Sequence, residues 1–175
     1  GEGAAQQSLN LVVKADVQRF RLVVPIGKAS LRLDLYGVHL QASAKPTGLD
    51  RGQFHGVVRK QDIDTQVIPS IADLLTDQIN SAPDAPSSKQ LISTFETGSI
   101  STQKCQANPA DCCATNPKTC RILPEEVKAN ILVQTLLVPD LQCYDAQGRW
   151  KPTPGGAAKD CLSVGLGFTA VRAQF

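Results

Sequence analysis

Residues Lys28–Ser43 read KASLRLDLYGVHLQAS, and this stretch carries the clearest strand pattern in the chain. Leucines alternate with polar residues as far as Leu35, and the apolar residues then move by one position and run from Tyr36 to Ala42. Strict alternation is typical of a half-buried strand, because successive side chains point to opposite faces of a sheet. A shift of one position predicts a β-bulge near Leu35–Gly37, or a strand that crosses between two sheets.

Weaker alternation predicts further strands on both sides of this stretch. The predicted strands before it are Leu9–Val13 and Val17–Val24, and those after it are Gln53–Lys60, Leu141–Tyr144 and Leu162–Phe175. Glycines alternate with apolar residues in the last of these, which indicates close packing against another backbone or a tight bend.

Two other segments change to the helical period. In Asp62–Asn80 the apolar residues fall on one face, and Pro69 suits a first helical turn. In Pro124–Val138 a proline again begins the pattern, and apolar residues lie on nearly all sides, so we expect this helix to be well buried. Lys89–Glu96 fits either a short helix or an extended segment.

These patterns together define an α+β fold. We expect an antiparallel β-sheet or a β-sandwich with two main helices packed on it, and a C-terminal third held together by disulfides. The chain of 175 residues is long enough for one domain with its own core, and we place a single domain over residues 1–175. Within it, we expect residues 1–7 to be frayed and residues 99–123 to form a cysteine-rich loop.

The six cysteines are close together and lack the C-x2–4-C spacing that zinc sites usually show. They indicate disulfides, and therefore an oxidising, extracytoplasmic compartment. Cys112 and Cys113 are adjacent and are not expected to bond to each other, because the ring would strain the peptide between them. The possible pairs are then Cys105–Cys112 with Cys113–Cys120, or crossed and nested versions, and the favoured third pair is Cys143–Cys161.

Composition argues against several classes of partner. The chain has 18 Lys and Arg against 16 Asp and Glu, a net charge of +2, and no long basic run. We therefore expect no nucleic acid and no anionic membrane surface as partner. No apolar stretch approaches the ~20 residues that span a bilayer. Methionine is absent even at position 1, so we expect that the sequence starts after processing, which is compatible with a removed signal or an upstream lipid anchor.

The loop before the last predicted strand carries the first candidate site. Asp140, Asp145 and Asp160 could offer carboxylates to Ca²⁺, which prefers six to eight oxygen ligands. Their spacing is not D-x-D-x-D-G, and the simpler interpretation is that they cap turns. Trp150 and Tyr144 lie in the same region and are the aromatic residues that we expect to contact a ligand.

Catalysis has less support in the sequence. His39 and His55 are the only histidines, and both lie on the polar side of predicted strands, near Asp34 and Asp50 in the sequence. A hydrolase could use either histidine with a nearby acid, but the chain lacks the G-x-S-x-G motif that positions a nucleophilic serine.

The most distinctive run lies at the C-terminus: Pro139-Asp140, then Asp145, then Lys159–Val171 with the sequence KDCLSVGLGFTAV. It resembles the ending of a group of uncharacterised bacterial cell-envelope lipoproteins, which looks like P-D-x-D followed by D-x-L-S-x-G-x-G-F-T-A-V. The upstream segment GQFHGVV at 52–58 and the helix at Ile68-Pro69 are also similar to segments of that group. Some members carry an EF-hand-like segment where this chain has its cysteines, and the resemblance implies that disulfides take over its ordering role here.

The sequence therefore predicts a non-catalytic, extracytoplasmic domain of the bacterial cell envelope, in the periplasm, on the outer-membrane surface or secreted. We expect it to bind another envelope protein or to assemble with copies of itself, without a cofactor. The alternative is a module that binds Ca²⁺ or a small ligand through the Asp140–Asp160 loop. The third hypothesis is a hydrolase that uses His39 or His55.

Overall fold

The computed structural model describes residues 11–26, 29–45 and 48–171, so the fraying expected for residues 1–7 lies outside the described residues. Six strands form one sheet in the order β1-β2-β3-β6-β4-β5, and all neighbouring strands are antiparallel. The strands are β1 Leu11–Ile26, β2 Ala29–Lys45, β3 Gly48–Arg59, β4 Leu141–Tyr144, β5 Trp150–Pro154 and β6 Cys161–Val171. The predicted α+β fold with an antiparallel sheet is confirmed, and the described strands form a single sheet rather than a sandwich.

The predicted bulge lies in β2, at the point where its apolar pattern shifts. Tyr36 pairs with Val57 of β3, whereas His39 pairs with His55, so β2 carries one extra residue between the two pairs. Gly37 adopts φ +57° there, a left-handed conformation that glycine takes without a steric cost. Because of the extra residue, the Tyr36 side chain lies on the face of the sheet opposite the main core, next to the second, smaller apolar cluster.

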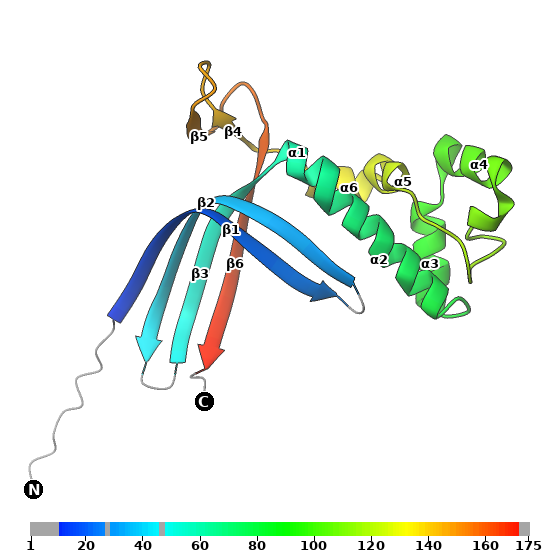
Figure 1. The fold of residues 1–175 in the computed structure, drawn as a ribbon, viewed down its shortest axis with the longest axis horizontal. Coiled ribbons are helices and arrows are strands. Elements are labelled where there is room, and N and C mark those ends of the chain that lie inside the picture. The colour runs from blue at the N-terminus through cyan, green and yellow to red at the C-terminus, as the bar shows by residue number, and fades with distance from the viewer. Residues whose placement is uncertain (1–10, 27–28, 46–47, 172–175) are drawn as a thin grey trace, which may run out of the picture.

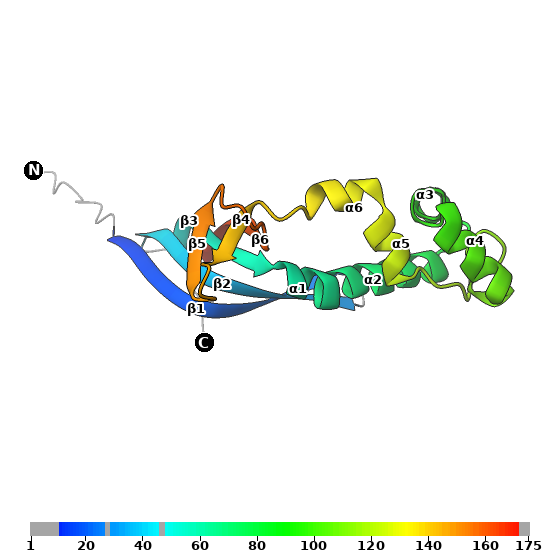
Figure 2. The same ribbon diagram turned by 90° about the horizontal axis from the view of Figure 1, so that it is seen from above.

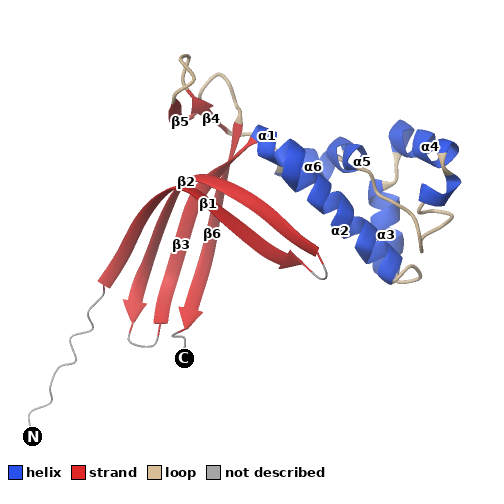
Figure 3. Cartoon of the chain, viewed as in Figure 1, coloured by secondary structure: helices blue, strands red, loops and turns tan. Residues whose placement is uncertain are grey.

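The helices extend from one end of the sheet as an arm (Figures 1 and 2), and strands and helices occupy separate parts of the molecule (Figure 3). The arm begins with α1 Lys60–Asp62, a π-helical turn Ile63–Val67 and α2 Ile68–Ser81, which together match the first predicted helix. It continues with α3 Pro86–Phe95, α4 Gly98–Ala107, a 3-10 turn Pro109–Asp111, α5 Pro124–Ala129 and α6 Ile131–Leu136. No helix in the described part of the chain is long and apolar enough to cross a membrane.

Two predictions about the arm need correction. The segment expected to be a cysteine-rich loop over residues 99–123 begins with the helix α4. The single helix expected over Pro124–Val138 is two short helices that are broken at Asn130, where the backbone is extended. The Asn130 side chain accepts a hydrogen bond from the Leu132 N–H at 3.0 Å and so caps α6. The undecided segment Lys89–Glu96 lies almost entirely within α3.

The main core lies between the sheet and the first helices of the arm. Leu35 and Val38 from β2 are on the same side in spite of their odd spacing, because the bulge lies between them. They pack with Phe54 and Val58 of β3 and with the apolar face of α2. A second, smaller cluster holds Val57, Cys143 and Cys161, with Tyr36, Leu141 and Tyr144 partly buried around it.

The expectation that the second helix is well buried is wrong for most of its length. Val127 and Val133 are buried, but four apolar side chains are 53–74% exposed: Ile131, Leu132, Leu136 and Val138. The arm extends away from the sheet, so α6 has a packing partner on one side only (Figure 2). We call these four side chains the α6 apolar surface.

Buried polar contacts hold the cysteine-rich segment against the arm. The Lys104 ammonium is 2.8 Å from the Glu96 carboxylate and 3.1 Å from that of Glu126, and all three side chains are almost fully buried. Glu96 also accepts hydrogen bonds from the N–H groups of Cys113 and Ala114, each at 2.7 Å. These contacts add to the two disulfides and to the burial of Cys113, Cys120 and Ile122 in the main core, and together they order the loop around the cysteines.

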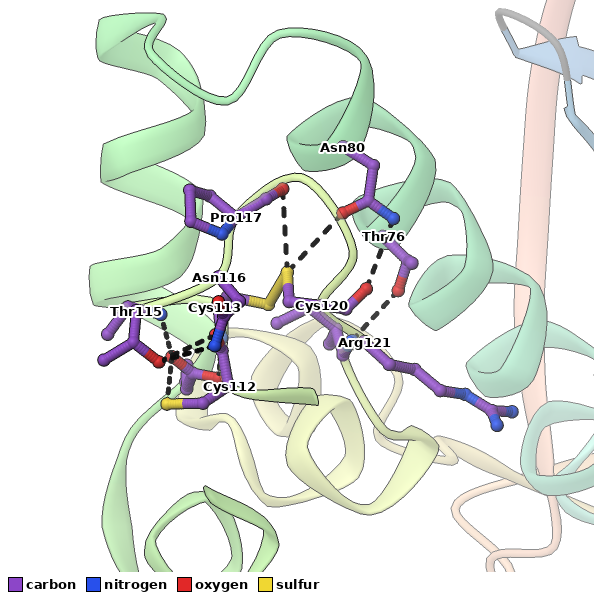
Figure 4. Close-up of a disulfide and its surroundings, with 12 residues drawn as sticks. Thr76, Asn80, Cys112, Cys113, Thr115, Asn116, Pro117, Cys120 and Arg121 are labelled. Carbon is purple, nitrogen blue, oxygen red and sulfur yellow. Dashed lines mark hydrogen bonds between the residues drawn. A yellow bond between two sulfur atoms is a disulfide. The ribbon is translucent and has the colours of Figure 1, made fainter. Parts of the chain in front are cut away.

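The same segment is attached to α2 on its other side. Asn80 of α2 donates a hydrogen bond to the carbonyl oxygen of Cys120 at 3.2 Å, next to the Cys113–Cys120 disulfide (Figure 4). The Thr76 hydroxyl accepts a hydrogen bond from the Ile122 N–H at 2.9 Å. The cysteine-rich segment thus belongs to the arm and lies apart in space from the strands that build the candidate site (Figure 1).

Candidate functional site

All six cysteines form disulfides, and none is free. The pairs are Cys105–Cys112, Cys113–Cys120 and Cys143–Cys161. The third is the pair that the sequence favoured, and the first two decide between the pairings that the sequence left open. Cysteine sulfur atoms that form a disulfide carry no thiolate to bind a metal ion. The two clusters in which a carboxylate, Glu96 or Asp160, lies beside a disulfide are therefore not metal sites.

The Cys143–Cys161 disulfide fastens the β4–β5 hairpin to β6. Strands β4 and β6 share only one residue pair, Leu141 with Cys161. Side-chain contacts therefore supply most of the remaining attachment. Asp160 accepts a hydrogen bond from the Cys143 N–H at 2.6 Å. Asp140 accepts one from the Ser163 N–H at 2.7 Å and a second from the Ser163 hydroxyl.

The third predicted calcium ligand, Asp145, caps its own turn. It accepts hydrogen bonds from the N–H of Gln147 at 3.0 Å and from the N–H and guanidinium of Arg149 at 2.9 and 2.8 Å. The Arg149 backbone N–H, helped by these other donors, lowers the pKa of Asp145. Burial works to raise the pKa of Asp140, but the hydrogen bonds from Ser163 outweigh it and the pKa is lowered.

These contacts explain the three aspartates without a metal ion. Among the residues that the structure describes, Asp140, Asp145 and Asp160 do not form a group whose ligand atoms converge. Calcium binding therefore stays a prediction, and the geometry gives it no added support.

The predicted aromatic pair, in contrast, lies in a larger aromatic cluster. The Trp150 ring centroid is 5.5 Å from that of Tyr144, and 5.9 Å from that of Tyr36 on the distant strand β2. A Cβ atom at Gly37 would lie 3.4 Å from the Trp150 ring, at van der Waals contact, so the indole lies close to the backbone of β2. Trp150 nevertheless remains 39% exposed. We call the surface formed by Tyr36, Tyr144 and Trp150 the aromatic cleft.

Two arginines lie against Tyr36. The Arg59 guanidinium is 4.3 Å from the centroid of the Tyr36 ring, and that of Arg19 is 5.8 Å from it, which are cation–π distances. Burial, with a contribution from the Asp62 carboxylate, raises the pKa of Tyr36. The tyrosine is thus a neutral ring with cations on its face.

The carboxylates near these arginines balance their charges unequally. Arg59 forms a bidentate ion pair with Asp62, with distances of 2.7 and 3.0 Å. Arg19 and Arg21 share a single carboxylate, that of the buried Asp34, at 2.6 and 2.8 Å. Among the side chains that the structure describes there, two guanidinium groups against one carboxylate leave one positive charge, and the Arg19 side chain is 55% exposed.

Two hollows meet at Trp150. The first has a volume of about 530 Å³ and extends toward β1, where Gln18 and Arg19 line it. The second has a volume of about 570 Å³ and extends toward β3 and β6, where His55 and Ser163 line it. Both are lined by Tyr36, Gly37, His39 and Trp150. The indole therefore stands between two hollows on the face of the sheet that the helical arm does not cover.

The two histidines pair across β2 and β3 and are exposed beside the second hollow. Ser163 also lines this hollow, but its hydroxyl donates directly to Asp140, whereas a hydrolytic triad needs a histidine between the serine and the acid. Both carboxylate oxygens of Asp34 accept hydrogen bonds from arginines, and the Asp50 side chain lies outside the described residues. The hydrolase hypothesis stays a prediction.

The sequence predicted Trp150 and Tyr144 as ligand contacts and did not predict that Tyr36, Arg19 and Gly37 lie beside them. The shift of apolar pattern at Leu35–Gly37 was the available signal, because it turns Tyr36 away from the core. The position of Arg19 depends on the β1–β2 register, in which Arg19 pairs with Tyr36.

Comparisons of the chain with protein-family models, with curated proteins and with solved structures found no match. The fold and the site define a disulfide-bonded α+β protein with an aromatic cleft on its sheet. The resemblance to cell-envelope lipoproteins stays a prediction.

Proposed function

We propose that this chain is a non-catalytic, extracytoplasmic binding domain of the bacterial cell envelope, and that the aromatic cleft is its ligand site. The three disulfides indicate an oxidising, extracytoplasmic setting. Assignment to the bacterial envelope rests on the C-terminal resemblance alone.

The observation that carries the proposal is the exposed indole of Trp150 between two hollows. Ligand sites are concave, mostly apolar and largely preformed, with volumes of about 300–1,000 Å³, and both hollows fall within this range. The Cys143–Cys161 disulfide and the contact with Gly37 hold the ring in place before any ligand arrives. Preorganisation of this kind lowers the entropic cost of binding.

The polar groups around the cleft favour binding over catalysis. Arg59 is engaged by Asp62, and Ser163 by Asp140. A group that acts as a nucleophile or general base needs an acid–base partner aligned with the reacting atom. Here the partners neutralise or position the side chains instead.

Fluorescence offers a direct test, because Trp150 is the only tryptophan in the chain. We expect soluble fragments of purified bacterial envelope to change its emission in a saturable way. Calorimetry should detect the same binding in the wild type and in Phe20→Ala, which removes a 43% exposed aromatic residue outside the cleft, but not in Trp150→Ala. Binding that survives Trp150→Ala would place the site elsewhere.

A second candidate function is self-assembly, and the α6 apolar surface favours it. Four apolar side chains of one short segment are 53–74% exposed, with no charged residue between Ile131 and Val138, and association of two copies would bury such an apolar surface. We expect sedimentation to show concentration-dependent dimers that Leu132→Ser with Leu136→Ser abolishes. The control Val23→Ser removes an apolar residue that is 50% exposed on β1 and should leave the dimers intact. A wild type that is monomeric at all concentrations would remove this candidate.

A further inference from the structure

The two hollows on either side of Trp150 indicate the class of ligand. We propose, on the basis of the proposed function, that the aromatic cleft binds an acidic oligosaccharide, with one sugar ring in each hollow and an acidic group near Arg19. The inference combines three features: the repeat of the hollows, the mixed chemistry of their walls and the unbalanced charge at one end.

The repeat of the hollows favours a ligand made of similar rings in series. Both hollows have nearly the same volume, and they share the wall formed by Tyr36, His39 and Trp150. A chain of linked rings that crosses the indole would place consecutive units in the two spaces. A single compact ligand would leave one hollow unused.

The walls suit a ring with apolar faces and polar edges. Sugar rings present C–H groups on their faces, which pack on aromatic planes, and hydroxyl groups on their edges, which need hydrogen-bonding partners. The cleft offers three aromatic rings and, among the residues that line the hollows, the polar side chains of Gln18 and His55. An acyl chain would need an enclosed apolar cavity, whereas Trp150 is 39% exposed.

The charges argue against a cationic ligand. An aromatic cage binds quaternary ammonium groups because the ring faces attract cations. Here Arg59 and Arg19 already lie against Tyr36, so a further cation would meet like charge. Asp62 neutralises Arg59, and among the described residues that line the two hollows Arg19 is the one arginine or lysine.

Arg19 lies where an acidic substituent would reach it from the first hollow. It shares Asp34 with Arg21, so the pair keeps one positive charge, and the Arg19 side chain is 55% exposed. A carboxylate or phosphate on the sugar in the first hollow would complete this cluster. Charge-assisted hydrogen bonds to arginine are among the stronger polar contacts, and we expect the acidic group to tighten binding about tenfold.

The test is a titration of the wild-type chain monitored by Trp150 fluorescence and calorimetry. The probes are a panel of acidic oligosaccharides of two to six rings, their neutral counterparts, a proline-rich peptide, a single-stranded oligonucleotide and choline. We expect acidic saccharides to bind most tightly, neutral ones about tenfold more weakly, and the other probes not to bind.

Two variants locate the acidic group. Arg19→Gln should reduce affinity for acidic saccharides to that for the neutral counterparts and leave the neutral affinity unchanged. Arg32→Gln makes the same change of charge at an exposed position of β2 that lines neither hollow, and it should retain the preference. Equal effects of both variants would refute the role of Arg19. Circular dichroism spectra that match the wild type would confirm that both variants fold.

The outcomes separate this inference from the proposed function. Saturable binding of the peptide, the oligonucleotide or choline, without any saccharide, would overturn the ligand class and keep the cleft as a binding site. Failure of every probe and of envelope fragments to change Trp150 emission would overturn both.

Discussion

Removal of the Cys143–Cys161 disulfide should release the β4–β5 hairpin and with it the aromatic cleft. The perturbation is the double variant Cys143→Ala with Cys161→Ala, which removes two sulfur atoms that are fully buried. Alanine is used because serine would bury a hydroxyl group without a partner. Apart from this bond, the hairpin is held by one strand pair, by a few aspartate contacts and by the packing of Trp150 and Tyr144 in the aromatic cluster with Tyr36.

The expected loss of stability follows from the length of the closed loop. The chain-entropy relation gives about 3 kcal/mol for a bond between residues 18 apart, as Cys143 and Cys161 are. A loss of that size would lower the melting temperature of a chain of this length by roughly 6–12 °C. For Cys105–Cys112, where the separation is 7, the same relation gives about 2 kcal/mol.

Urea unfolding followed with two probes provides the assay. Trp150 emission reports on the hairpin, and circular dichroism at 222 nm reports mainly on the helical arm. In the wild type we expect coincident transitions, and in the variant we expect the Trp150 transition at clearly lower urea than the helical one. The control Cys105→Ala with Cys112→Ala should destabilise the chain without separating the probes. An unshifted Trp150 transition in the first variant would show that non-covalent contacts alone hold the hairpin.

Three further predictions test the features that support the fold and the cleft. Lys104→Met should lower the free energy of unfolding by about 3–5 kcal/mol, because it leaves the buried carboxylates of Glu96 and Glu126 without a cation. A loss below about 1 kcal/mol in urea melts would contradict this. Arginine hydrogen bonds, acting against burial, hold the pKa of Asp34 well below its ordinary value of 3.8, so its stabilising effect is present above about pH 4 and is lost as the pH falls below it. Asp34→Asn should therefore flatten the loss of stability between pH 4 and pH 2, and an unchanged acid slope would exclude this role. Gly37→Ala should destabilise the chain by roughly 1–2 kcal/mol, because φ is +57° there, while Trp150 emission should stay close to that of the wild type, because the added methyl group meets the ring at 3.4 Å, an ordinary van der Waals contact; an unchanged urea midpoint would contradict the first expectation.

The sequence predicted the sheet better than it predicted the arm, and the reason is physical. Alternation in β2 is a local pattern that records which face of the sheet is buried, so both the strand and its bulge near Gly37 could be read from it. The apolar residues of 131–138 gave a wrong expectation of burial, because the pattern shows what a helix could bury and not whether a packing layer lies on that side. The α6 helix has such a layer on one side only.

The candidate site was predicted in part for a related reason. Trp150 and Tyr144 lie near each other in the sequence, on one hairpin, and could be proposed together. Tyr36 and Arg19 reach them only through the strand order and the register of β1 with β2. Such pairings depend on contacts distant in sequence, which local patterns do not contain.

The spacing of the three disulfides has a consequence for the order in which the molecule is completed. Two of the bonds join residues 7 apart, and the third joins residues 18 apart, close to the C-terminal end of the described chain. A chain that is synthesised or exported from its N-terminus can close the first two bonds while the last strand is still absent. The Cys143–Cys161 bond can form only after Cys161 has been synthesised or exported, and until then the hairpin that carries Trp150 is not fixed to β6. Tyr36 and Arg19 precede it in the chain. A chain that lacks only the Cys143–Cys161 bond would therefore keep both disulfides of the arm while its β4–β5 hairpin is released from β6, and binding at the proposed cleft would depend on this one bond.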